Sequence, residues 1–145
     1  MEMRTVFAHL KNASDREVAE WLSSFVGLRC SDDMWRYPHA EAPVLYIEFY
    51  RDYHSEYEPE EYERLVKELG GEPSTTVVAD VSGRADGTTE VKALFGGLLR
   101  RFDGLASDNY SSHYWTIDEI ENNALVDGLT FFDFMGSYRL DRDFS

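Results

Sequence analysis

Four stretches of the chain predict β-strands because their apolar and polar residues alternate or because they are rich in β-branched and aromatic side chains. The clearest lies at residues 44–53, where apolar positions alternate with charged and tyrosine positions. Residues 3–10 and 75–81 predict two more strands, and residues 129–134 predict the last one. The sheet is therefore expected to draw on strands spread along the whole chain.

Apolar residues three and four positions apart predict helices that begin near Ser14, Pro59, Thr88 and Thr116. Ser14 and Thr116 are each followed three residues later by glutamate, the capping box that satisfies free N–H groups at a helix start. Pro59 suits the first turn of its helix. The third helix has the most regular apolar stripe: Val91, Leu94, Phe95, Leu98, Leu99 and Phe102.

The order of elements predicts an α+β fold. If residues 28–37 pair with residues 44–53, the first eighty residues form βαββαβ, the ferredoxin-like pattern, followed by a C-terminal extension of helices and a strand. The alternative is an α/β fold with a parallel sheet, in which 28–37 is a loop. The alternation near residue 45 favours the first, because a central parallel strand should be continuously apolar. Residues 105–115 are expected to be irregular, and 1–145 to form one domain.

The predicted core has two layers of helix contacts. Leu45, Ile47 and Phe49 should face helices built from residues 18–26 and 65–69. Three residues of the third helix should be buried on a further layer: Leu94, Leu98 and Phe102.

Charge narrows the possible partners. The 145 residues include 28 acidic and 14 basic side chains, a formal net charge of −14, and the pI is near 4.5. Phosphate binding needs a basic surface, so nucleic acid and anionic membranes are not expected as direct partners. A basic protein is the expected partner, although the solvating surface of a halophilic protein would explain the same charge.

Other sequence features indicate a cytoplasmic protein without cofactor or metal. There is no leader of the secretory type and no apolar run long enough to span a membrane. The single cysteine, Cys30, cannot form an internal disulfide, and no Cys/His spacing typical of zinc occurs. We expect a metal-free monomer or small homo-oligomer.

Signals for catalysis are weak. His54 and Glu56 have the His-x-Glu spacing of zinc deaminases, but the Pro-Cys-x-x-Cys that such a site needs does not follow. A small hydrolase using Asp80, Asp108 and His113 stays an alternative, although the sequence contains no Gly-x-Ser-x-Gly elbow for a nucleophilic serine.

The most distinctive composition lies at residues 46–63, which combine tyrosines with many carboxylates. Tyrosine gives a large contact area at a small entropic cost, and surface carboxylates steer a basic partner toward the site. The alternative is a solvated helix face beside a partly buried tyrosine strand. The residues predicted to bind the partner are Tyr50, Asp52, Tyr53, Glu56, Tyr57 and Glu58.

A short, cysteine-poor, strongly acidic α+β domain, rich in Tyr and Trp and without a catalytic motif, resembles the immunity proteins that bacteria carry against their own antibacterial toxins. The resemblance covers the whole chain as composition and architecture, and no family motif transfers a functional residue. It implies inhibition by tight one-to-one binding, commonly over the active site of a toxin. Many such toxins are basic nucleases, for which an acidic patch replaces the phosphates of the nucleic acid.

The predicted function is therefore that of a non-catalytic, acidic immunity or inhibitor module that neutralises a basic partner protein such as a toxin. Two alternatives stay open. One is a small-molecule-binding or regulatory ferredoxin-like domain, and the other is the hydrolase described above.

Overall fold

The computed structural model describes residues 4–27, 34–38, 42–51, 58–83, 85–133 and 136. Its helices and strands follow one another as β1 (Arg4–Lys11), α1 (Asp15–Val26), β2 (Trp35–Tyr37), β3 (Leu45–Phe49), α3 (Pro59–Leu69), β4 (Thr75–Val81), α4 (Thr88–Arg101), β5 (Asp103–Asp108) and α5 (Ile117–Glu121). The fold is α+β, as the sequence predicts.

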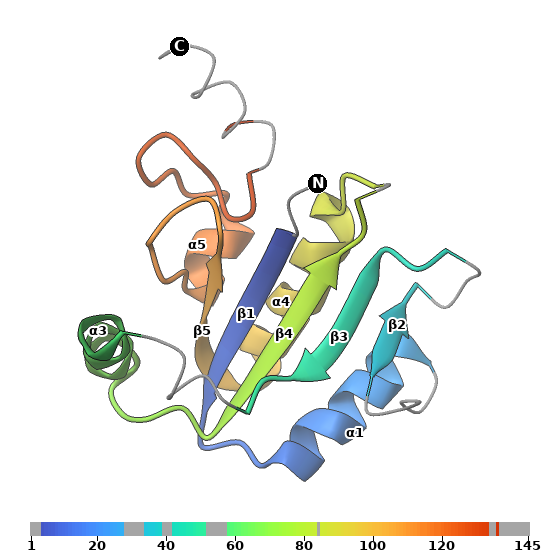
Figure 1. Ribbon diagram of the computed structural model, residues 1–145, viewed down its shortest axis with the longest axis horizontal. Coiled ribbons are helices and arrows are strands. Elements are labelled where there is room, and N and C mark those ends of the chain that lie inside the picture. Colours follow the sequence, from blue (N-terminus) through green and yellow to red (C-terminus); the bar gives the residue numbers. More distant parts are fainter. Residues whose placement is uncertain are drawn as a thin grey trace.

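The strands form one five-stranded sheet in the order β2-β3-β4-β1-β5 (Figure 1). Every pairing between these strands is antiparallel. The predicted pairing of the ambiguous segment with the strand near residue 45 is confirmed, with Trp35 opposite Ile47. The alternative of a parallel sheet is wrong, and the alternation in β3 is the reason: its two faces meet different environments.

The order of elements βαββαβ is found through β4, but the ferredoxin-like strand order is not confirmed. That order needs a split βαβ unit, in which two parallel strands flank a third. β1 and β2 are separated by two strands and run in opposite directions. β4 is buried at six of its seven positions, so it takes the centre and pairs with both β3 and β1. The split unit is instead β4-α4-β5, with β1 between the two parallel strands.

Two predictions about the C-terminal third are wrong. Residues 103–108, expected to be partly irregular, form the edge strand β5, and Ala106 exchanges backbone hydrogen bonds of 2.9 and 2.7 Å with Trp115. Among residues 129–133, the described part of the expected last strand, the chain forms turns, and Phe132 has φ 51°. The turns place Phe131 and Phe132 in the core, which accounts for the apolar run.

The helix ends follow the predicted caps with one exception. The capping box of Ser14 and Glu17 is present, and so is the second box at the start of α5. The N-cap of α4 is Gly87, with φ 80°, rather than a threonine. The carboxylate of Asp86 accepts a hydrogen bond of 2.9 Å from the Thr88 N–H, so it satisfies a free donor of the first turn.

The apolar residues gather in two clusters on opposite faces of the sheet. The larger contains Leu45 and Ile47 of β3, Val18 and Leu22 of α1, and the apolar stripe of α4. The residues of that stripe are all buried, as predicted. The expectation that β3 also packs on α3 is wrong. Leu65 and Leu69 of α3 belong to the smaller cluster, with Leu105 of β5. α3 covers that face because the alternating positions of β1 and β5 present Phe7 and Leu105 there.

The contact of α1 with α4 depends on Gly97. A Cβ added at Gly97 would lie 2.7 Å from the ring of Trp21, whereas one at Gly96 would meet nothing closer than 3.7 Å, the mobile end of Arg100. We expect Gly97→Ala to lower the free energy of unfolding by about 1–2 kcal/mol through overpacking. Gly96→Ala should raise it or leave it unchanged, since alanine favours helix by roughly 1 kcal/mol. Urea denaturation of both variants checks this, and equal stabilities would contradict it.

Candidate partner-binding site

The structure describes two of the residues predicted to bind the partner, Tyr50 and Glu58. Asp52, Tyr53, Glu56 and Tyr57 lie outside the described residues. Tyr50 follows β3, donates its backbone N–H to the Thr76 carbonyl at 2.9 Å, and is half-buried. Glu58 is exposed just before α3 and makes no side-chain cap hydrogen bond.

The outer side of α3 is acidic. Glu58 and Glu60, Glu61 and Glu63 are exposed, while Leu65 faces inward. Glu60 and Arg64, and likewise Glu63 and Lys67, are four positions apart, a spacing that suits ion pairs on a helix, but neither pair is among the ion pairs of the described chain. Arg64 instead lies 3.8 Å from Glu68. We call Glu58, Glu60, Glu61 and Glu63 the α3 acidic face, and its charge is not neutralised by a described ion pair.

Beside the α3 acidic face lies a cleft of about 460 Å³, which we call the α3–β5 groove. Its walls come from Phe7 of β1, from Glu61 and Arg64 of α3, and from residues 107–112 and Tyr114. The acidity of α3 is predictable from the sequence, whereas the groove is not, because its walls come from segments far apart in the chain.

Aromatic rings form part of this face of the sheet. Phe7 stacks on His9, with ring centroids 5.9 Å apart and an interplanar angle of 10°, and Tyr50 meets Phe7 edge-on at 5.5 Å. Tyr114 meets His9 edge-on at 5.9 Å. The guanidinium of Arg64 lies 4.8 Å above the Tyr114 ring and also donates to the Ser112 carbonyl. Arg64 thereby ties α3 to the segment that follows β5.

His9 lies beneath the groove and was not predicted as a site residue. It is fully buried, and its Nε2 lies 3.1 Å from the Oγ of Ser107, which lines the groove. Burial lowers the pKa of His9 to about 3, so the ring is neutral at neutral pH. A serine beside histidine can be a nucleophile with its base. An imidazole with so low a pKa accepts a proton poorly, so the pair favours a buried structural hydrogen bond over catalysis.

Asp108 has a structural role in the groove wall. Its carboxylate accepts backbone hydrogen bonds from Tyr110 at 2.9 Å, Ser111 at 3.2 Å and Phe132 at 2.7 Å. Burial raises the pKa of Asp108, and these three donors oppose that rise. The carboxylate therefore holds the turn after β5 and the C-terminal segment together.

The three residues of the hydrolase alternative do not form a triad. Asp80 is level with Thr5 and accepts its hydroxyl at 3.1 Å, whereas Asp108 is level with Val6. Because neighbouring residues of β1 point to opposite faces, the two carboxylates lie on opposite sides of the sheet. His113 Nε2 lies 3.0 Å from both carboxylate oxygens of Glu119, so its ring pairs with the capping glutamate of α5.

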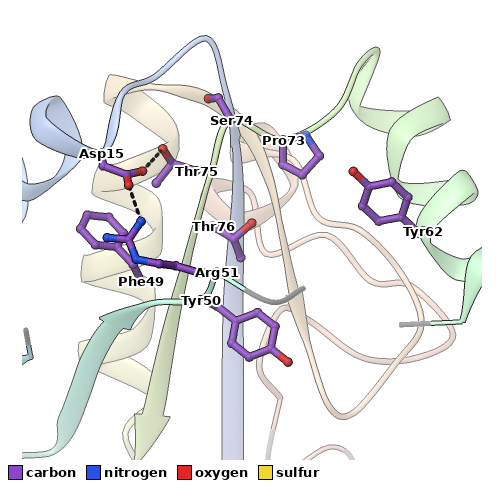
Figure 2. A pocket seen from close by; sticks show the side chains of 9 residues that line it. All are labelled: Asp15, Phe49, Tyr50, Arg51, Tyr62, Pro73, Ser74, Thr75 and Thr76. Carbon is purple, nitrogen blue, oxygen red and sulfur yellow. Dashed lines mark hydrogen bonds and ion pairs between the residues drawn. The ribbon is translucent and has the colours of Figure 1, made fainter. Parts of the chain in front are cut away.

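A second pocket, of about 220 Å³, lies where β3 ends and β4 begins (Figure 2). Its main polar groups bind one another: Arg51 Nη1 lies 2.6 Å from Asp15, and the Thr75 hydroxyl donates to the same carboxylate at 2.8 Å. The hydrogen bond from Arg51 is the largest cause that lowers the pKa of Asp15. These contacts therefore join Arg51, which follows β3, to the start of α1 and to β4.

The described residues contain no group of three or more His, Cys, Asp or Glu side chains that could hold a metal ion. Within the same residues, no helix is both long enough and apolar enough to cross a membrane. Comparison of the chain with protein-family models, with curated proteins and with solved structures gives no match.

Proposed function

We propose that this protein is a non-catalytic, acidic binding protein of the cytoplasm that neutralises a basic partner protein, with a bacterial toxin as the expected class of partner. The observation that carries the proposal is the position of the α3 acidic face next to the α3–β5 groove. The composition adds support, because it resembles that of immunity proteins and has a net charge of −14.

The two features have different physical roles in such a complex. Exposed carboxylates mainly accelerate the encounter with a cationic surface, and that effect weakens as salt screens it. A groove with aromatic walls offers a desolvated contact for an anchoring side chain, which mainly slows dissociation. The α3 acidic face and the α3–β5 groove, which share Glu61, supply both.

A small-molecule-binding domain is the second candidate. Its support is the volume of the groove, since ligand pockets commonly measure about 300–1,000 Å³. Isolation of the protein with a stoichiometric small molecule, released on denaturation and identified by mass spectrometry, would favour this candidate over the first.

The test begins with affinity capture from lysate of the source organism, followed by purification of the captured partner. Glu60→Lys should slow its association several-fold at low salt, and the effect should fade at high salt. Glu20→Lys, an exposed reversal on α1, is the control with the same change of charge and should have a smaller effect. Rates measured by biolayer interferometry check this. An acidic partner would contradict the proposal, and so would an association rate that changes neither with salt nor with the Glu60→Lys substitution.

The partner-binding residues predicted from the sequence within positions 52–57 are tested in the same experiment. Asp52→Lys and Glu56→Lys should slow association at low salt, whereas Tyr53→Ala or Tyr57→Ala should speed dissociation at any salt, by up to about 2 kcal/mol for a central anchor. If these variants leave both rates unchanged, the binding site excludes this segment.

A further inference from the structure

α3 covers its face of the sheet through a small apolar contact. Leu65 and Leu69 are buried there with Leu105 and Tyr114, whereas α1 and α4 belong to the large cluster on the opposite face. Figure 1 shows α3 at the edge of the molecule, beside β5. Isolated helices shorter than about 12–15 residues are marginal in water, and α3 has 11 residues. A helix that depends on so small a contact can open locally at a lower free energy than the whole protein.

Two cationic side chains tie α3 to its neighbours, and both end on backbone carbonyls. Lys11 Nζ of β1 donates to the Leu69 carbonyl at 2.9 Å, at the last turn of the helix. Arg64 donates from α3 to the Ser112 carbonyl, and its side chain is 47% exposed. Water can replace either carbonyl as the partner of the cation, so these ties add little to the free energy that holds α3 closed.

The chain after α3 has a flexible pair of residues followed by a fixed point. The helix ends at Gly70, with φ 83°, and Gly71 follows it. The Ser74 N–H donates to the Leu10 carbonyl at 2.8 Å, and its hydroxyl donates to the Ala13 carbonyl at 2.7 Å. Two glycines can change φ and ψ without a side-chain clash, so α3 can move while β4 stays in the sheet.

A buried imidazole lies beneath α3. His9 has no exposed surface, is level with Leu105 of β5, and lies between the rings of Phe7 and Tyr114. Burial lowers the pKa of His9 to about 3, so the closed structure holds the ring neutral. A ring released to water takes up a proton below its ordinary pKa of 6.5.

The charges around His9 do not compensate a proton on its ring. The titratable side chains that the surrounding segments carry on this side are Lys11 of β1, Asp80 of β4, Asp103 of β5, Glu61, Tyr62, Arg64 and Glu68 of α3, and Tyr50 and Tyr114. Asp80 accepts the Thr5 hydroxyl at 3.1 Å, two same-face positions along the sheet from His9. Burial alone is the cause of the lowered pKa of His9, and no charged neighbour contributes to it.

We propose that α3 opens away from the sheet as a unit when His9 takes up a proton, while the side of the sheet covered by α1 and α4 stays folded. Movement about Gly70 and Gly71 exposes the ring to water. The open form binds a proton that the closed form excludes, so acid favours opening. Opening removes the α3 acidic face and one wall of the α3–β5 groove, so acid should also release the partner. That consequence alone rests on the proposed function.

Amide hydrogen exchange of the full chain tests the inference without a partner. Protection factors, corrected for the intrinsic exchange rate at each pH, are measured at pH 7 and pH 5 for residues 65–69 of α3 and 94–98 of α4. The α3 amides should be protected less than the α4 amides, by about tenfold or more. Their protection should fall about 25-fold from pH 7 to pH 5, the effect of one proton bound only by the open form. Equal protection of the two helices would mean that α3 opens only with the whole protein, which overturns the inference.

His9→Gln removes the proton but can keep a hydrogen bond to Ser107, so the fall in α3 protection should shrink below about threefold. Ser107→Ala is the matched control. It removes the partner that lies 3.1 Å from the imidazole but leaves the ring titratable, so the fall should stay near 25-fold. An unchanged fall in His9→Gln, or its loss in Ser107→Ala, would overturn the inference. If His9→Gln does not fold, the Ser107→Ala variant and the comparison of α3 with α4 decide. The proposed function is tested separately by partner capture, so either proposal can fail alone.

Discussion

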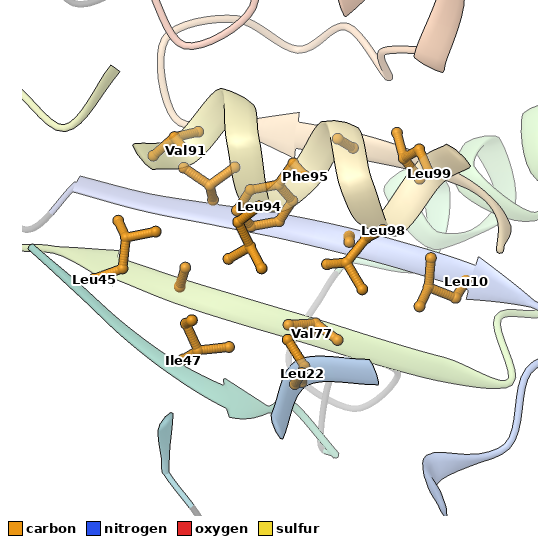
Figure 3. Close-up of a cluster of buried hydrophobic side chains, with 14 of the residues drawn as sticks. Leu10, Leu22, Leu45, Ile47, Val77, Val91, Leu94, Phe95, Leu98 and Leu99 are labelled. Atoms are coloured by element: carbon orange, nitrogen blue, oxygen red, sulfur yellow. The ribbon is translucent and has the colours of Figure 1, made fainter. Parts of the chain in front are cut away.

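Leu98→Ala should lower the free energy of unfolding by about 2–5 kcal/mol, the cost of a cavity in a core that cannot close around it. Leu98 has no exposed surface and points from α4 toward the sheet, near Val77 and Leu22 (Figure 3). It therefore joins α4, α1 and β4, so the space left by its side chain would be bordered by three elements that are each held by other contacts.

Leu125→Ala is the matched control, because Leu125 is 69% exposed and loses the same atoms from the surface. Its effect should stay within about 0.5 kcal/mol. Both values come from urea denaturation followed by circular dichroism. A Leu98→Ala variant as stable as the Leu125→Ala variant would show that the α4 stripe does not face the core.

The helices were predictable because their signals are local. The capping box of Ser14 and Glu17, the glycine after α1 and the stripe of α4 each lie within one or a few turns of chain, so sequence spacing alone locates them. Strands β3 and β4 were predictable for the same reason, since their β-branched and aromatic residues are contiguous.

The pairing of the strands was not predictable in the same way. β5 has the sequence Asp-Gly-Leu-Ala-Ser-Asp, without a β-branched or aromatic residue, and it becomes a strand because β1 offers it a free edge. A Cβ added at Gly104 would overlap the His9 carbonyl, so glycine at this position permits the close approach of the two strands. Such contacts join residues about a hundred positions apart, and no local pattern reports them.

The same difference between local and long-range signals applies to the candidate site. The acidity of α3 is a property of one segment, and the sequence predicts it directly. The groove needs Phe7, Arg64 and Tyr114 to meet, and it exists only once β1, α3 and the segment after β5 are placed. His9 gave a partial signal, as a polar residue between the apolar Ala8 and Leu10, but its burial follows from the packing of α3 and Tyr114 over that face.

The protein should lose stability as the pH falls below 6.5, and His9 should be a major cause. Burial lowers the pKa of His9 to about 3, whereas the unfolded chain has an ordinary value of 6.5. Between these two values the unfolded state binds a proton that the folded state excludes, so the free energy of unfolding falls with decreasing pH. The slope is about 1.4 kcal/mol per pH unit, or roughly 2–3 kcal/mol between pH 6.5 and about 4.5.

His9→Gln separates this effect from the carboxylates, because glutamine can keep a hydrogen bond to Ser107 but cannot be protonated. The pKa values of Asp15, Asp86 and Glu119 are lowered in the folded state, so these groups lose their contribution only at more acidic pH. The variant is expected to be less stable at neutral pH, since its side chain does not reproduce the stack on Phe7. Asp108, whose pKa burial raises, acts alike in both proteins. The free energy of unfolding of the variant should therefore fall less than that of the native chain from pH 6.5 to about 4.5, by up to about 1.4 kcal/mol per pH unit. Urea midpoints measured across this interval test the prediction. Parallel curves for the two proteins would mean that His9 is protonated in the folded state too, and that the face of the sheet covered by α3 admits water.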